Sequence, residues 1–218
     1  MLWPLQYHLP SVVLVLGLIL GFVGCNGDSN DDDIDQATLQ EVETILSAVI
    51  NETTEAVNAV EAQLFPAPVR QQVTTRQEPV NLPVVCLEGG QLRVVGQVLT
   101  EDTGFTLDAT ESFTNCDGLN GTIAVTAEVT REVTDDGVET AYTATLNGTV
   151  INACTLAFNQ TVVAASRSAL TGDTVGTIDG AITATCESTS FTCLLDALVF
   201  PQDPATVRVI LADSCLRH

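Results

Sequence analysis

Cysteine is the residue of this 218-residue chain whose type and spacing most restrict its chemistry. Cys25 stands alone near the N-terminus, and six further cysteines follow at wide intervals. An even number of cysteines in an exported chain is typical of a disulfide framework, so we expect three disulfides. The six residues are Cys86, Cys116, Cys154, Cys186, Cys193 and Cys215.

The local sequence favours particular partners for these cysteines. Cys186 and Cys193 flank a short segment that resembles a hairpin with a two-residue turn at Thr189 and Ser190. Such a turn places the two cysteines opposite each other, within disulfide distance. The predicted pairs are therefore Cys186–Cys193, Cys86–Cys116 across the first expected hairpin, and Cys154–Cys215 at the C-terminus.

Metal binding is the alternative use of these side chains. The chain has no Cys-x-x-Cys spacing, and after Cys25 its one imidazole is that of His218. Zinc sites usually combine such spacings with histidine, so disulfides are favoured over zinc. An acidic run, Asn26 to Asp35, loosely resembles a calcium loop but lacks the glycine and glutamate that an EF-hand needs. We predict no metal site and no other cofactor.

The groups that usually carry catalysis are scarce. Nucleophilic catalysis needs a nearby base, and the chain after Cys25 contains no Lys and one His. No glycine-rich phosphate loop occurs. Paired carboxylates act in glycosidases, but 28 acidic residues would bring two together in almost any fold. We therefore predict a non-catalytic protein, with a carboxylate-dependent hydrolase as a remote alternative.

The segment 11–25, SVVLVLGLILGFVGC, is an apolar run closed by small residues and a cysteine. Its length is typical of the apolar region of a signal peptide and is short for a membrane-spanning helix. Phe22-Val23-Gly24-Cys25 resembles the lipobox of bacterial lipoproteins. The alternatives are an ordinary signal peptide cleaved near Gly24 and an uncleaved anchor.

The lipobox resemblance implies that residues 1–24 are removed and that Cys25 becomes the first residue, acylated with chains such as palmitate. Several acyl chains hold a protein on a membrane durably. The expected location is therefore the bacterial cell envelope, on the outer membrane or facing the periplasm, with the lipid as the membrane contact.

The formal charge of −21 restricts the partners of this protein. A chain without a basic stripe cannot neutralise phosphates, which excludes nucleic acid as a partner. The same charge opposes direct docking on anionic lipid. The simplest interpretation is a soluble, self-repelling surface, and the alternative is a surface that binds cations.

Three segments precede the main domain. Residues 25–35 are short and acidic, as expected of a solvated tether. Residues 36–65 have the 3- and 4-residue apolar period of an amphipathic helix, which Asp33 or Asp35 can cap. Residues 66–83 are rich in Pro and Gln, which predicts an extended linker.

One face of the predicted helix carries an apolar stripe, and Glu52, Glu55 and Glu61 lie off it. The stripe packs on the domain itself or binds a partner, and it is our candidate interaction surface. Its residues are Val42, Ile45, Leu46, Val49, Val57, Val60 and Leu64.

Residues 84–218 have the two-residue period of half-buried strands, with many Thr and Val and with Gly-containing turns. A weak repeat places Asn or Asp before Gly121, Gly148 and Gly180. It marks either turns or bulges that curl a sheet. The predicted fold is mainly β: one N-terminal amphipathic α-helix, then a bent antiparallel β-sheet or partial barrel of about eight strands.

Together these features favour a non-catalytic, lipid-anchored cell-envelope protein with a structural or interaction role, and an envelope protein as partner. The alternative is a carrier that holds a lipophilic molecule between helix and sheet. A continuous apolar cavity there would favour the carrier, and a filled core the interaction role.

Overall fold

The computed structural model describes residues 34–65, 75–86, 89–135, 137–168, 174–202, 206–208, 211 and 215–218. The signal segment, Cys25 and nearly all of the tether lie outside these residues. The described chain contains one helix followed by strands, in the order α1 (Gln36–Leu64), β1 (Arg76–Val85), β2 (Gln91–Glu101), β3 (Gly104–Cys116), β4 (Leu119–Thr134), β5 (Gly137–Ile151), β6 (Cys154–Arg167), β7 (Thr174–Cys186), β8 (Thr189–Gln202), β9 (Thr206–Arg208) and β10 (Cys215–Arg217).

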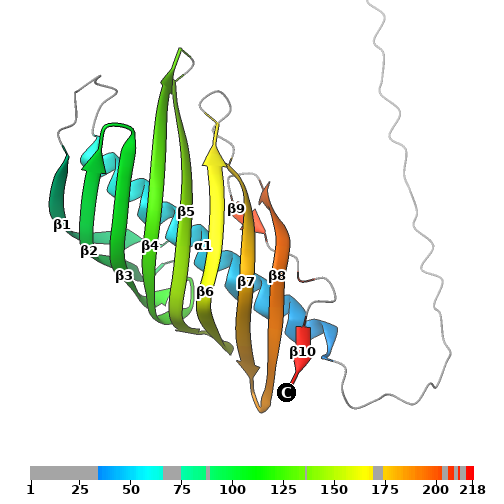
Figure 1. Ribbon diagram of the computed structural model, residues 1–218. Helices are drawn as coiled ribbons and strands as arrows, with labels where there is room; N and C mark the ends of the chain where they lie inside the picture. Colours follow the sequence, from blue (N-terminus) through cyan, green and yellow to red (C-terminus); the bar gives the residue numbers. More distant parts are fainter. Residues whose placement is uncertain are drawn as a thin grey trace, which may run out of the picture. The chain divides into compact units, whose positions relative to one another are not determined.

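The strands form one antiparallel sheet that is not closed (Figure 1). Strands β1 to β8 are neighbours in chain order, β10 continues the sheet beyond β8, and β9 pairs with the far end of β8. This confirms the predicted fold class: one helix and a bent antiparallel sheet. Within the described residues, no helix has both the length and the apolar character needed to cross a membrane.

The chain enters the sheet earlier than the sequence predicts. Residues 76–83, expected to belong to the linker, form most of β1 and pair with β2 in continuous register. Pro79 and Pro83 obscured this strand because proline cannot donate to a strand ladder. They are accommodated because β1 lies at the edge of the sheet and needs bonds on one side only.

Two of the repeated glycines bend the sheet. Gly121 on β4 and Gly148 on β5 have φ values of 132° and 146°, which residues with a side chain rarely adopt. A Cβ atom on either residue would lie 2.3 Å from a carbonyl oxygen of the neighbouring strand. The register between β5 and β6 shifts next to Gly148. The bulge interpretation of the repeat is therefore confirmed there.

Helix α1 begins where the sequence predicts. The Asp35 side chain accepts the Thr38 backbone N–H at 2.8 Å and the Thr38 hydroxyl at 2.6 Å. These hydrogen bonds, first that of the Thr38 side chain, lower the pKa of Asp35. The cap thus satisfies a backbone donor that would otherwise be free at the first turn.

The helix crosses one face of the sheet, here called the inner face, and the strands bend around it (Figure 1). It contacts β1, β2, β4, β6 and β9. Near its start, Glu43 accepts the backbone N–H of Leu211 at 2.7 Å, so the C-terminal segment also touches it. Between residues 45 and 60 only Glu55 is exposed. The middle of α1 is therefore enclosed on nearly all sides, unlike a helix that lies on a surface.

Three disulfides join the six predicted cysteines, which indicates an oxidising, exported compartment. Cys86–Cys116 is confirmed, with 5.4 Å between the Cα atoms. The other two predicted pairs are wrong, because the structure joins Cys154 to Cys186 and Cys193 to Cys215.

The correction follows from the register of the β7–β8 hairpin. Its turn is at Glu187 and Ser188, two residues before the predicted turn, and Glu187 has a φ of 52°. A β-branched residue such as Thr189 adopts positive φ at greater cost. Cys193 consequently lies opposite Ile182, and Cys186 lies opposite Cys154 on β6.

Peptide mapping of the unreduced protein is expected to recover Cys154 linked to Cys186, because the two residues are direct neighbours across β6 and β7. The control is the Cys86–Cys116 peptide, because this disulfide does not depend on the position of the β7–β8 turn. A peptide linking Cys186 to Cys193 would contradict the observed register.

Candidate functional site

The buried polar cluster, defined as Thr53, Thr54, Glu111 and Tyr142, lies between α1 and the inner face of the sheet. The Thr53 hydroxyl on α1 donates to Glu111 Oε2 on β3 at 2.8 Å. The hydroxyls of Thr54 and Tyr142 lie 2.5 Å apart, and Thr54 also donates to the carbonyl of Ile50 at 2.7 Å. These contacts join the middle of the helix to β3 and β5 by polar bonds within an otherwise apolar core.

Burial changes the acidity of both titratable members of this cluster. It raises the pKa of Glu111 to about 7, and the hydrogen bond from Thr53 opposes the rise. Burial also raises the pKa of Tyr142 to about 12; the bond to Thr54 opposes this, and the charge of Glu111 adds to it. Glu111 Oε1 is buried without a hydrogen-bond partner.

A carboxyl group with a pKa near 7 is suited to general acid–base catalysis, provided that it touches a substrate. Glu111 is fully buried and offers no surface to a substrate, and the hydroxyl of Tyr142 is held against Thr54 on α1. The arrangement instead fixes how α1 sits on the sheet. Its chemical effect is to make helix packing depend on protonation.

The sequence contains a signal for Glu111 that we missed. Phe105, Leu107, Ala109 and Phe113 alternate along β3 and are all buried, and Glu111 occupies the same phase. A carboxylate at an inward position of a strand is unusual, and this phase is visible in the sequence alone.

Glu52 also differs from expectation. The sequence pattern predicts that it lies off the apolar stripe, yet it is 1% exposed, whereas Glu55 on the next turn is exposed. An oxygen of its carboxylate and the sulfur atoms of Cys86 and Cys116 lie within 4.8 Å of one another. Because the two sulfurs are bonded to each other, the group is not a metal site while this disulfide is formed.

A second polar contact fixes the C-terminal end of α1. Arg131 on β4 donates from Nε to Glu61 Oε1 at 2.7 Å, and both side chains are more than four-fifths buried. The Arg131 guanidinium lies 4.0 Å from the centre of the Phe65 ring, and Phe65 packs against Phe105. Largely buried ion pairs and cation–π contacts of this kind stabilise a helix end in one position.

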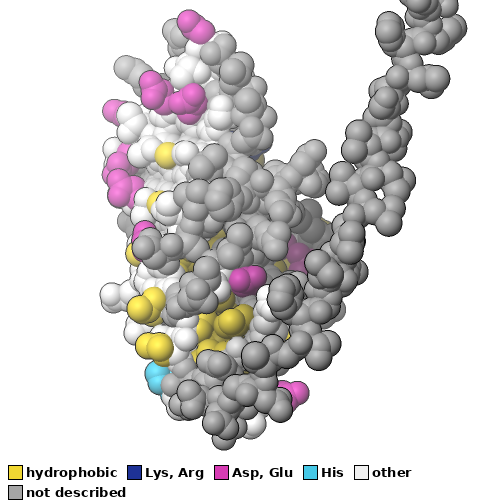
Figure 2. Space-filling model, turned by 90° about the vertical axis from the view of Figure 1, so that its right-hand side faces the viewer, with side chains coloured by type: hydrophobic (Ala, Val, Ile, Leu, Met, Phe, Trp, Pro, Cys, Tyr) yellow, Lys and Arg dark blue, Asp and Glu magenta, His cyan; other side chains and the backbone are white. Residues whose placement is uncertain are grey.

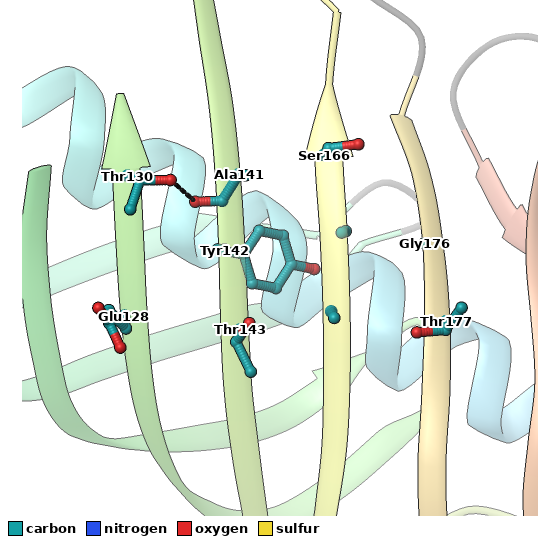
Figure 3. A pocket seen from close by; sticks show the side chains of 10 residues that line it. Glu128, Thr130, Ala141, Tyr142, Thr143, Ser166, Gly176 and Thr177 are labelled. Atoms are coloured by element: carbon teal, nitrogen blue, oxygen red, sulfur yellow. Dashed lines mark hydrogen bonds between the residues drawn. The ribbon is translucent and has the colours of Figure 1, made fainter. Parts of the chain in front are cut away.

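The outer face of the sheet, opposite α1, carries a shallow depression of about 520 Å³ over β4 to β7 (Figure 3). Small residues such as Ala141 and Gly176 leave the space, and Thr143, Ser166 and Thr177 line it with hydroxyl groups. Glu128 supplies a carboxylate there. The depression is open to solvent, and its mixture of hydroxyl groups and small apolar residues suits both hydrogen bonding and close contact with a partner.

Charge is unevenly distributed over the surface. Figure 2 shows acidic side chains gathered towards one end of the face that it presents and hydrophobic side chains towards the other. Leu194 on β8 and Leu216 on β10 are 59% and 69% exposed, and both lie on the outer face of the last strands. These two leucines provide a small apolar area next to the polar strand surface.

The predicted interaction residues require a correction. Six of the seven are 0–3% exposed and belong to the protein's own core, and the seventh, Leu64, is partly buried against it. They are therefore not available to a partner while α1 sits in the sheet. The six are Val42, Ile45, Leu46, Val49, Val57 and Val60.

The comparisons with known proteins give no match: no family model, no curated protein and no solved structure resembles the chain closely enough to be reported.

Proposed function

We propose that this protein is a non-catalytic, lipid-anchored component of the bacterial cell envelope with a structural or interaction role. Its three disulfides fit exposure to an oxidising compartment. The lipobox-like sequence Phe22 to Cys25 and the acidic run after it would hold the domain near, but not on, a membrane.

The observation that carries the proposal is the burial of the cluster between α1 and the sheet. The described carboxyl group best tuned for acid–base chemistry, that of Glu111, is bonded to the helix and hidden from solvent. Glu61 is engaged by Arg131 and Thr140. These polar groups serve the packing of the helix, which supports a binding or scaffolding role over catalysis.

We propose a different interaction surface from the apolar stripe of α1. With α1 enclosed, the surface available to a partner is the outer face of the sheet, where hydroxyl side chains surround Glu128. A carrier role has less support. The apolar stripe that would line its cavity is packed against the sheet, so a ligand would have to displace core side chains.

Changing Cys25 to Ser is expected to release the protein from the membrane fraction or to leave it unprocessed, because serine offers no sulfur for acylation. Membrane partition and the mass of the N-terminal peptide measure this. The matched control is the Cys154→Ser/Cys186→Ser double variant, which removes a disulfide of the domain and leaves Cys25 in place. Unchanged processing and membrane partition of the Cys25 variant would refute lipid anchoring.

The non-catalytic part of the proposal is tested separately. A broad hydrolase screen of the purified, disulfide-bonded protein should detect no turnover that depends on a carboxylate. Activity that disappears when one described carboxylate is changed to the amide would overturn this part and favour the hydrolase alternative.

A further inference from the structure

A groove of about 310 Å³ lies at the C-terminal end of α1, between the helix, β5 and the last residues of β6. Its walls carry charges of both signs, Glu61 from the helix and Arg167 from β6. Phe65 and Val138 add apolar surface. The groove therefore offers one positive pole, one negative pole and an apolar wall between elements that are fixed in place.

Arg167 is the distinctive residue of this groove. Three other described arginines use their side chains within the protein, Arg76 on Glu78, Arg93 on Asn81 and Arg131 on Glu61. Among the described residues, the exposed Arg167 guanidinium makes no hydrogen bond or ion pair. In a chain with a net charge of −21, a guanidinium without a carboxylate is exceptional, and its planar fork suits a carboxylate ligand.

The register explains why Arg167 stays free beside Glu61. Arg131, Thr140 and Arg167 are direct cross-strand neighbours on β4, β5 and β6, so they share one face. The Glu61 carboxylate is held over the first two, by Arg131 at 2.7 Å and by the Thr140 hydroxyl at 3.3 Å. It is thereby kept out of reach of Arg167, and the groove separates the two groups.

The opposite pole is the carbonyl end of α1 together with the Glu61 carboxylate, whose Oε1 is paired with Arg131 and whose Oε2 accepts the longer bond of 3.3 Å from Thr140. A helix C-terminus presents carbonyl oxygens and a partial negative charge, which attract cations. The last turn of α1 carries no basic residue. A simple anion would be repelled from this end of the groove, and a simple cation would be repelled from Arg167.

We propose that this groove binds a small zwitterion of the α-amino acid class. Its carboxylate pairs with the Arg167 guanidinium, and its ammonium group lies towards Glu61 and the carbonyl end of α1. Phe65 and Val138 contact its side chain. Such a ligand satisfies both poles at once, which neither a carboxylate nor an amine alone can do.

Three probes that share a branched four-carbon unit test the proposal on the full, disulfide-bonded chain. Valine carries both charges, isovalerate lacks the amine, and isobutylamine lacks the carboxylate. Calorimetric titration should show valine binding at least about tenfold more tightly than either analogue. Changing Arg167 to Gln should weaken valine binding by about tenfold or more while the disulfide map stays unchanged, because this side chain makes no contact that the fold needs.

Arg93→Gln is the matched control, since Arg93 is an exposed arginine on β2 far along the sheet. It should bind valine as the unchanged protein does. Isovalerate binding as tightly as valine would identify a plain anion site, and equal binding of isobutylamine a plain cation site. Either result overturns the proposal, as does the absence of valine binding up to about 10 mM.

Discussion

Changing Leu46 to Asp is expected to unfold the protein or to lower its free energy of unfolding by at least about 4 kcal/mol. Leu46 is fully buried between α1 and the sheet. The substitution removes its apolar contacts and adds a carboxylate to a core in which no described residue that is fully buried carries a positive charge. Urea denaturation followed by circular dichroism measures the loss. A domain of this size has about 5–15 kcal/mol in total, so the variant should populate unfolded chains at room temperature.

Gln40→Asp is the control, because it places the same side chain on the exposed side of the same helix. It should change stability by less than about 1 kcal/mol. A Leu46→Asp protein with normal stability would mean that α1 does not depend on the sheet. The apolar stripe would then again be a candidate surface for a partner.

The helix shows what periodicity can and cannot predict. The spacing of Val42, Leu46 and Val49 predicts an amphipathic helix, and the structure has one with the predicted cap. Periodicity cannot show how much of the helix is covered, because this depends on strands that come later in the chain. Glu52 and Thr53 are buried because the bent sheet encloses the middle of α1.

The disulfides also show that local sequence does not predict contacts between distant segments, in this case the register of neighbouring strands. The sequence predicts correctly that all six cysteines pair, because their number and the exported context require it. It cannot fix which strand lies opposite which at single-residue precision. A shift of the turn to Glu187 and Ser188 was enough to give Cys186 and Cys193 different partners.

The polar residues of the site also divide into those that the local sequence predicts and those that it does not. The phase of Glu111 along β3 is local and predictable, but its partner Thr53 lies 58 residues earlier. Arg167 gives no signal at all in the sequence, since its isolation depends on Glu61 being held by Arg131. Contacts between distant segments therefore decide which polar residues are structural and which remain free.

Changing Glu111 to Gln is expected to remove most of the pH dependence of stability between pH 5 and pH 8. The pKa of Glu111 is raised from 4.5 to about 7, so the folded protein holds a proton that the unfolded chain releases. Its contribution to stability is full below pH 4.5 and is lost as the pH rises through 7. Above that range the ionised, buried carboxylate costs about 3 kcal/mol, at roughly 1.4 kcal/mol for each pKa unit.

Glutamine stays neutral at every pH, so this loss should disappear. Its amide oxygen can still accept the hydroxyl of Thr53, but its NH₂ group would occupy the position of Oε1, which has no partner. Burying that group costs about 1–3 kcal/mol. We therefore expect the variant to be less stable than the unchanged protein at pH 5 and to equal or exceed it at pH 8.

We expect the free energy of unfolding, plotted against pH, to cross between the unchanged protein and the Glu111→Gln variant. Such a crossing distinguishes packing that depends on a proton from a simple loss of fit. Tyr142, the other titratable member of the cluster, has a pKa of about 12 and stays neutral across this range. Glu128→Gln on the exposed outer face of β4 is the control and should leave the pH dependence as it is. If Glu111→Gln kept the original pH dependence, the proton would reside elsewhere. If it lowered stability equally at both pH values, Glu111 would act only by filling space.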